Sequence, residues 1–292
     1  MYILGLSGGR RMGNSEVLLR EALMGAQELG ATVELVRLMD VKINPPLGEG
    51  EGDSRLDHTA FLRKKTVDAD GIIVSAPSYC LTPPGYTINI RDRISQRHAA
   101  PSKLQVGALI GVGGSDWVQL LLPMMYLILP HGQCKLVDQM LLTHTVRPGQ
   151  AVLNDKAIAR ANKLGRNVVE ALKLPENEVK YVGDEYWTCP LCHQNLLRIR
   201  GKYVECPICD IQGNIEITED GIKVTFPEDN FKTHHWGPEG LKRHTSIINE
   251  SSRIYKERYE EVKDKLKKYE AHIPATVPPA IEPPPPWLPR ES

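Results

Sequence analysis

Four cysteines form the most specific chemical pattern in this chain. They stand as two Cys-Pro-x-Cys pairs, thirteen residues apart, at Cys189, Cys192, Cys206 and Cys209. Each pair places two thiolates on one tight turn, and two such turns make a closed tetrahedral sulfur site for a metal ion. Zinc and iron both accept four thiolates. A closed site has no open coordination position, so we expect the metal to be structural.

A glycine-rich loop is the second pattern. Residues 6–15 contain three glycines, two arginines and small polar side chains, between an apolar run and an amphipathic segment. Glycine lets backbone amides approach an anion, and the start of the next helix adds unpaired N–H donors and partial positive charge. Arg10 or Arg11 can neutralise a phosphate, while Asn14 and Ser15 can cap the helix or donate to phosphate oxygens. The loop predicts a phosphate site, with an ordinary βα turn as the alternative.

The elements that must position this loop alternate between strand and helix. Apolar runs predict strands at 2–6, 31–38, 71–76, 104–112 and 135–146. Amphipathic spacing predicts helices at 15–29, 58–67, 86–96, 116–129 and 154–172. This alternation predicts an α/β fold with a five-stranded parallel sheet and helices on both faces. Ligands of such sheets bind at the carboxyl ends of the strands, where loops 7–14, 77–85 and 111–117 fall.

Four segments, in this order, resemble the NAD(P)H-dependent FMN reductase family of flavodoxin-like proteins, near its iron–sulfur flavoprotein branch. They are GLSGGRRMGNS from Gly5, ADGIIVSAPSY from Ala69, INIRDR from Ile88 and GVGGS from Gly111. The likeness covers residues 1–174. It implies FMN as the cofactor and NAD(P)H as the electron donor.

The resemblance assigns the FMN site to three loops. The first would bind the phosphate, or form the turn that holds it, with Ser7, Gly9, Arg10, Asn14 and Ser15. The second would lie along the isoalloxazine ring, with Pro77, Ser78, Tyr79 and Thr82. The third would approach the pyrimidine side of the ring, with Gly113, Gly114 and Ser115. We assign no catalytic acid or base, because FMN itself carries the redox chemistry.

Two departures from the family pattern stand out. Gly8 occupies a position where the family commonly has a hydroxyl side chain. Residues 41–57 contain no cysteine, whereas the iron–sulfur branch carries clustered cysteines after its second strand. An iron–sulfur cluster at that position is therefore excluded by the lack of ligands.

The cysteine pairs, with predicted hairpins at 198–204 and 215–226, resemble a zinc ribbon. Rubredoxins carry similar Cys-Pro-x-Cys turns but separate them by a longer, aromatic-rich stretch. We therefore favour a structural Zn²⁺ ion, with iron as the alternative. Such a small module needs the metal because it cannot bury a sufficient core.

Composition limits the remaining possibilities. The 36 basic and 36 acidic residues cancel, so no overall field favours nucleic acid, and no apolar run reaches the roughly 20 residues of a membrane span. We expect a cytoplasmic protein with no membrane partner, assembled as a homodimer or homotetramer. The predicted domains are an FMN-binding domain at 1–176, a zinc ribbon at 184–228, a helical extension at 229–270 and a proline-rich tail or arm at 271–292.

Three functions remain open. The leading hypothesis is an FMN-dependent oxidoreductase that moves electrons from NAD(P)H to a small organic molecule, a quinone or a flavin. The second is an FMN electron-transfer protein whose ribbon or C-terminal arm docks a redox partner protein. The third is a zinc-dependent interaction module on a flavodoxin-like scaffold that has lost FMN.

Overall fold

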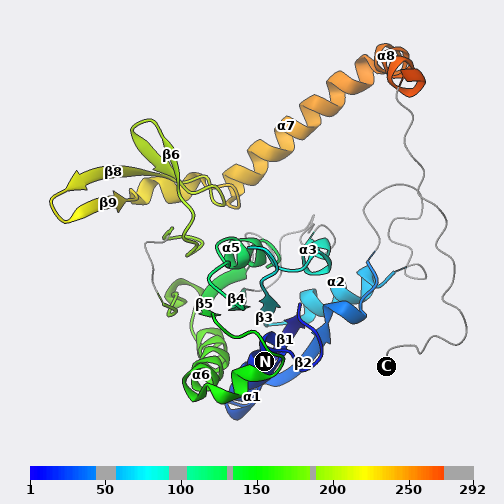
Figure 1. Cartoon of the computed structure of the whole chain (residues 1–292). Coiled ribbons are helices and arrows are strands. Elements are labelled where there is room, and N and C mark those ends of the chain that lie inside the picture. The colour runs from blue at the N-terminus through cyan, green and yellow to red at the C-terminus, as the bar shows by residue number, and fades with distance from the viewer. Residues whose placement is uncertain (44–56, 92–103, 130–133, 185–188, 273–292) are drawn as a thin grey trace, which may run out of the picture. The chain divides into compact units, whose positions relative to one another are not determined.

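The computed structural model describes residues 1–43, 57–91, 104–129, 134–184 and 189–272, and Figure 1 colours them along the chain. The contacts divide the chain into two units, Met1–Gly240 and Leu241–Ser292. Within the described ranges, no helix is long and apolar enough to cross a membrane. The finer domain boundaries expected from the sequence stay predictions.

The first unit contains a five-stranded parallel sheet. Its strands are β1 (Tyr2–Ser7), β2 (Thr32–Arg37), β3 (Gly71–Pro77), β4 (Gln105–Val112) and β5 (Cys134–Leu142). They pair in the order β2-β1-β3-β4-β5, all parallel. This is the flavodoxin-like order. Successive strands are added toward one edge of the sheet from β1 to β2 and toward the other edge from β3 onward, so the switch point lies between β1 and β3. The predicted fold class is confirmed.

Helices cover both faces of this sheet, as Figure 1 shows. They are α1 (Asn14–Glu28), α2 (Thr59–Asp68), α3 (Gly85–Asn89), α5 (Leu121–Tyr126) and α6 (Asp155–Leu172), with 3₁₀ turns at Leu38–Asp40, Gln150–Leu153 and Glu176–Glu178. One core cluster joins the sheet to α1 and α6, and a second joins it to α2, α3 and α5. β3 and β4 are buried on both faces, which explains their unbroken apolar sequences.

Two predicted elements differ from the structure. The last strand ends at Leu142 rather than Val146, because its partner β4 ends at Val112, which pairs with Leu142. The helix expected from Asp116 begins only at Leu121 and ends at Tyr126. Pro123 explains the late start, since proline lacks an N–H group and fits a helix only in its first turn. Of the helix expected at 86–96, the structure describes α3, which ends at Asn89, while residues 92–103 lie outside the described ranges.

The cysteine-bearing part of the first unit forms a second sheet. Strands β6 (Arg198–Arg200), β7 (Tyr203–Glu205), β8 (Gln212–Thr218) and β9 (Gly221–Thr225) are antiparallel neighbours in that order. A 3₁₀ turn, Glu228–Thr233, follows. Both predicted hairpins are present, so the ribbon architecture is confirmed.

The C-terminal part is helical, with α7 (Pro238–Glu257) and α8 (Tyr259–His272). Opposite charges three and four residues apart form ion pairs along it, including Arg253 with Glu250 and Arg258 with Glu261. Leu241, Ile248 and Tyr255 recur at a spacing of seven residues and are about half exposed. The proline-rich tail lies outside the described residues.

Candidate functional site

A cavity of about 430 Å³ lies at the carboxyl ends of the central strands. Seven of the predicted cofactor residues line it: Arg10, Asn14, Ser15, Pro77, Ser78, Tyr79 and Gly114. The lining set does not include Ser7, Gly9, Thr82, Gly113 or Ser115. The structure thus brings the three predicted loops to one cavity, and the cofactor roles of their residues stay predictions.

The glycines of the first loop make room for neighbouring hydroxyl groups. A Cβ atom at Gly9 would overlap the Ser15 hydroxyl, and one at Gly8 would lie 2.5 Å from the Thr87 Oγ1 atom. The Thr87 side chain thus occupies the space that a side chain at position 8 would need. The Gly8 carbonyl accepts hydrogen bonds from the Thr87 hydroxyl at 3.4 Å and from the Tyr86 hydroxyl at 2.9 Å.

The first turn of α1 lines the cavity without a capping side chain. Gly13 is the N-cap, and no side chain accepts a hydrogen bond there. The first amide groups of a helix lack partners within the helix and carry partial positive charge, which makes an uncapped turn suitable for an anion. The Ser75 hydroxyl donates to the Ser15 carbonyl at 2.5 Å and ties this turn to β3.

Asn14 joins the first loop to the loop after β5. Its Nδ2 group donates to the Thr145 and Arg147 carbonyls at 3.1 and 2.9 Å, and its Oδ1 atom accepts from the Ala151 amide at 3.0 Å. These bonds use both amide protons of the side chain. Asn14 therefore holds the loop that shapes the cavity, a role that the sequence analysis did not give it.

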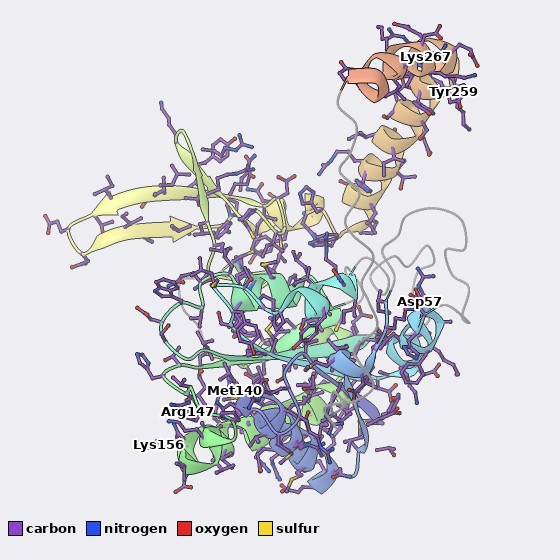
Figure 2. The ribbon with its side chains drawn as sticks, turned by 45° about the vertical axis from the view of Figure 1, so that its right-hand side comes forward. Asp57, Met140, Arg147, Lys156, Tyr259 and Lys267 are labelled. Atoms are coloured by element: carbon purple, nitrogen blue, oxygen red, sulfur yellow. The ribbon has the colours of Figure 1, made fainter. Side chains whose placement is uncertain are left out.

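The loop after β5 is a fourth wall that the sequence analysis missed. Thr145, Val146, Arg147 and Pro148 line the cavity, together with Gly13 and Val112. Figure 2 labels Arg147 on this loop, between Met140 of β5 and Lys156 of α6. The signal was available, because a loop that follows a parallel strand opens at the same edge of the sheet as the others.

The cavity has a positive charge balance. Arg10 and Arg147 both contribute to its lining, and none of the described lining residues is acidic. Both guanidinium groups are exposed and form no ion pair with the residues that the structure describes. Two cations and an uncapped helix start are therefore available to a single anion.

The nearby carboxylate of Glu16 does not offset this charge. Its side chain is fully buried, and it accepts hydrogen bonds from Arg37 Nε at 2.7 Å and Arg20 Nε at 3.0 Å. Burial raises the pKa of Glu16, but the hydrogen bonds from Arg37 and Arg20 together outweigh burial and hold the pKa below its ordinary value of 4.5. Its negative charge is therefore neutralised locally.

We expect Glu16→Gln to destabilise the protein at neutral pH and to have less effect in acid. Because the folded-state pKa lies below 4.5, the carboxylate stabilises the fold fully above that pH and loses this contribution as pH falls through the folded pKa. Urea unfolding of both proteins near neutral pH and well below pH 4.5 measures the difference. An equal difference in free energy of unfolding at the two pH values would contradict this assignment.

The second and third loops are bonded to each other. The Ser78 hydroxyl donates to the Trp117 carbonyl at 2.6 Å, and the Ser78 amide donates to the Val112 carbonyl at 2.7 Å. Ser115 Oγ accepts from the Trp117 amide at 3.3 Å. Ser115 therefore supports the third loop rather than lining the cavity.

The four cysteines converge as the spacing predicted. All four are buried, and their sulfur atoms lie within 4.8 Å of one another. The Cys192 and Cys206 sulfurs are 3.6 Å apart, close to the roughly 3.8 Å of a tetrahedral zinc–thiolate site. Both turns have the same form, since the His193 and Asp210 amides donate to the Cys189 and Cys206 carbonyls at 2.8 Å. This donor set fits a tetrahedral metal ion.

The cysteine cluster is packed against the larger sheet domain. Tyr126 of α5 and Leu127 contact the cluster, and burial together with the neighbouring Cys209 and Cys192 raises the pKa of Tyr126 well above its ordinary value. Gln194 donates to the Gln139 side chain of β5 at 3.0 Å, and Gln139 donates to the His193 carbonyl at 2.7 Å. A metal ion here would therefore stabilise the contact between the ribbon and the parallel-sheet domain as well as the ribbon itself.

Comparisons with known proteins agree with this arrangement. Residues 1–128 match the family described as NADPH-dependent FMN reductase. The chain is 29% identical to a flavone synthase of Aspergillus candidus over 289 residues, covering 86% of this chain and 89% of that protein. It is also 29% identical to an iron–sulfur flavoprotein of Methanocaldococcus jannaschii over 192 residues, covering 60% of this chain and 98% of the other.

A solved structure of a flavone reductase extends the likeness to nearly the whole chain. It superimposes with a TM-score of 0.80 at 29% identity and covers 96% of this chain and 100% of its own. The fold, the sequence match and these relatives agree. Residues 1–128 are similar to the NADPH-dependent FMN reductase family, and the chain is an oxidoreductase with a flavodoxin-like fold.

Proposed function

We propose that the chain binds FMN in the 430 Å³ cavity and passes electrons from NAD(P)H to a planar aromatic acceptor of the flavone type. The observation that carries this proposal is the acid-free lining, in which Arg10, Arg147 and the uncapped start of α1 meet. A phosphate monoester needs this combination of cations and amide donors. The volume lies in the range of ligand pockets, about 300–1,000 Å³.

The lining residues divide into two groups with different tasks. Arg10, Arg147, Ser15 and the first amides of α1 would hold the phosphate. Pro77, Tyr79, Val112 and Val146 offer apolar surface for the flavin ring. FMN supplies the hydride chemistry when bound, and among the lining residues that the structure describes only Tyr79 and the two arginines have titratable side chains. The protein residues therefore bind, orient and exclude water, as a flavin site requires.

The acceptor class rests on the relatives. One is named as a flavone synthase and the other as a flavone reductase, so both names specify a flavone, as product and as substrate respectively. Both cover more than four fifths of this chain, including the ribbon. In the reductive direction, a hydride from NAD(P)H and a proton from water would add two electrons and two protons to the acceptor.

We propose a structural Zn²⁺ ion in the four-cysteine site and self-association as a homodimer or homotetramer. The metal is supported by the four converging sulfurs. Self-association is supported by the apolar stripe of α7, formed by Leu241, Ile248 and Tyr255, whose side chains are about half exposed. Light scattering gives the number of chains, and a monomer at all concentrations would reject self-association.

The test uses the purified full chain. We expect a yellow protein that releases FMN on denaturation and oxidises NAD(P)H faster when flavone is added. A colourless protein that does not bind added FMN would reject the proposal. Oxidation that requires a protein acceptor, with no response to flavone or quinone, would instead support the electron-transfer hypothesis.

A further inference from the structure

The turn that carries Tyr79 has an unfavourable backbone. The Tyr79 amide donates to the Thr82 carbonyl at 2.7 Å, and the Thr82 amide donates back at 3.4 Å. The two residues between them, Cys80 and Leu81, have φ values of 49° and 78°. Two-residue turns with two positive φ angles strongly prefer asparagine, aspartate and glycine. Cysteine and leucine are therefore held in a left-handed conformation that disfavours them.

Neighbouring bonds hold this turn in place. The Leu81 carbonyl accepts from the Leu120 amide at 3.2 Å, just before α5. The Thr82 hydroxyl donates to the Tyr79 carbonyl at 3.3 Å. Ser78, immediately before the turn, bonds the Trp117 carbonyl. The turn and the 115–120 loop thus form one bonded unit beside the cavity, because Ser78 and Tyr79 also line the cavity.

This unit presents large apolar side chains at its surface. Tyr79 is 57% exposed, Trp117 is 63% exposed and Leu81 is 37% exposed. A glycine at position 81 would relieve the backbone and remove exposed apolar surface. The chain instead carries leucine there, although neither the positive φ angle nor the exposure to solvent favours a large apolar residue. Strained backbone that surrounding bonds maintain is typical of ligand-contacting segments.

We infer that Leu81 and Trp117 are specificity-determining residues that contact the acceptor, a planar polycyclic aromatic molecule, beside the flavin. This inference rests on the proposed function. A flat ligand of this class offers two apolar faces, and an indole and a leucine side chain on a fixed backbone provide matching contact area. The inference goes further than FMN binding, because it separates the groups that select the acceptor from those that hold the cofactor.

The variants separate side-chain contact from backbone strain. Leu81→Ala removes the side chain but keeps a residue that disfavours positive φ, whereas Leu81→Gly removes both. Cys80→Gly relieves strain in the same turn and keeps Leu81. Trp117→Ala removes the indole, and Ile217→Ala, at a residue 89% exposed on β8, controls for loss of exposed apolar surface.

We expect kcat/KM for flavone to fall about tenfold or more in Leu81→Ala, Leu81→Gly and Trp117→Ala. Cys80→Gly and Ile217→Ala should keep the wild-type value. Turnover of 1,4-benzoquinone, which is too small to need both contacts, and the Kd for FMN should be unchanged in all five. The two glycine variants should also unfold at a higher temperature than wild type.

Two results would overturn the inference. One is a flavone kcat/KM within about twofold of wild type in both Leu81→Ala and Trp117→Ala. The other is an equal fall for benzoquinone, which would place the effect on the flavin instead of the acceptor. A wild-type protein that binds no FMN, or binds it and does not turn over flavone, would reject the proposed function itself. The two failures are therefore distinguishable.

Discussion

Replacing Arg10 and Arg147 together by alanine is expected to weaken FMN binding about 100-fold and to leave riboflavin binding nearly unchanged. A hydrogen bond to a charged group contributes roughly 1.5–3 kcal/mol, and both guanidinium groups are exposed, so we take the lower end for each. Their sum, about 3 kcal/mol, corresponds to about 100-fold in Kd. Riboflavin lacks the phosphate, so it reports the ring contacts alone.

The measurement is a fluorescence titration of each flavin into apoprotein. Arg11→Ala is the matched control, because Arg11 is exposed in the same loop but is not a lining residue. Its Kd for FMN should stay near the wild-type value. If the double variant lost affinity for FMN and riboflavin equally, the phosphate would not lie between these arginines. Each single variant should show an intermediate loss that shrinks at high salt.

Cys189→Ser is expected to remove the bound metal and unfold the ribbon. A structural zinc site contributes about 10–16 kcal/mol of apparent binding free energy in small zinc modules, far more than the short strands β6 and β7 can supply. Metal analysis should find one zinc per wild-type chain and little in the variant. Limited proteolysis should then cut the variant within residues 189–226.

Cys80→Ser is the control for this experiment, since Cys80 is exposed and lies outside the cluster. It should retain the metal and resist proteolysis like wild type. If metal analysis finds iron instead of zinc, with visible absorption from thiolate ligation, the four-cysteine site would have an electron-transfer role and not a structural one. A metal-free wild-type protein with an intact ribbon would show that the four thiols fold without an ion.

The sheet could be predicted because its central strands are buried on both faces and therefore have unbroken apolar sequences. The cysteine site could be predicted because two pairs at this spacing permit few arrangements other than a tetrahedral site. The start of α5 was not predicted correctly, because the sequence after Asp116 keeps helical spacing. The position of Pro123 is the one sign in this segment that the helix begins later.

The walls of the cavity depend on contacts that are distant in sequence. Asn14 bonds carbonyls 131 and 133 residues away, and main-chain carbonyls leave no signature in residue types. Because the last strand was predicted to reach Val146, the loop after Leu142 that lines the cavity was not recognised. Strand propensity does not show where the neighbouring strand ends. The need for glycine at position 8 was hidden for the same reason, since Thr87, which leaves no room for a side chain there, comes from a different segment.

The Asn14 bonds also bear on the order in which the site can form during synthesis. The glycine-rich loop leaves the ribosome before its partners at Thr145, Arg147 and Ala151, which follow only after β5. A nascent chain that ends at residue 128, where the family match ends, has the first loop but lacks the fourth wall and Arg147. The complete wall of the cavity can therefore form only after residue 151 has been made.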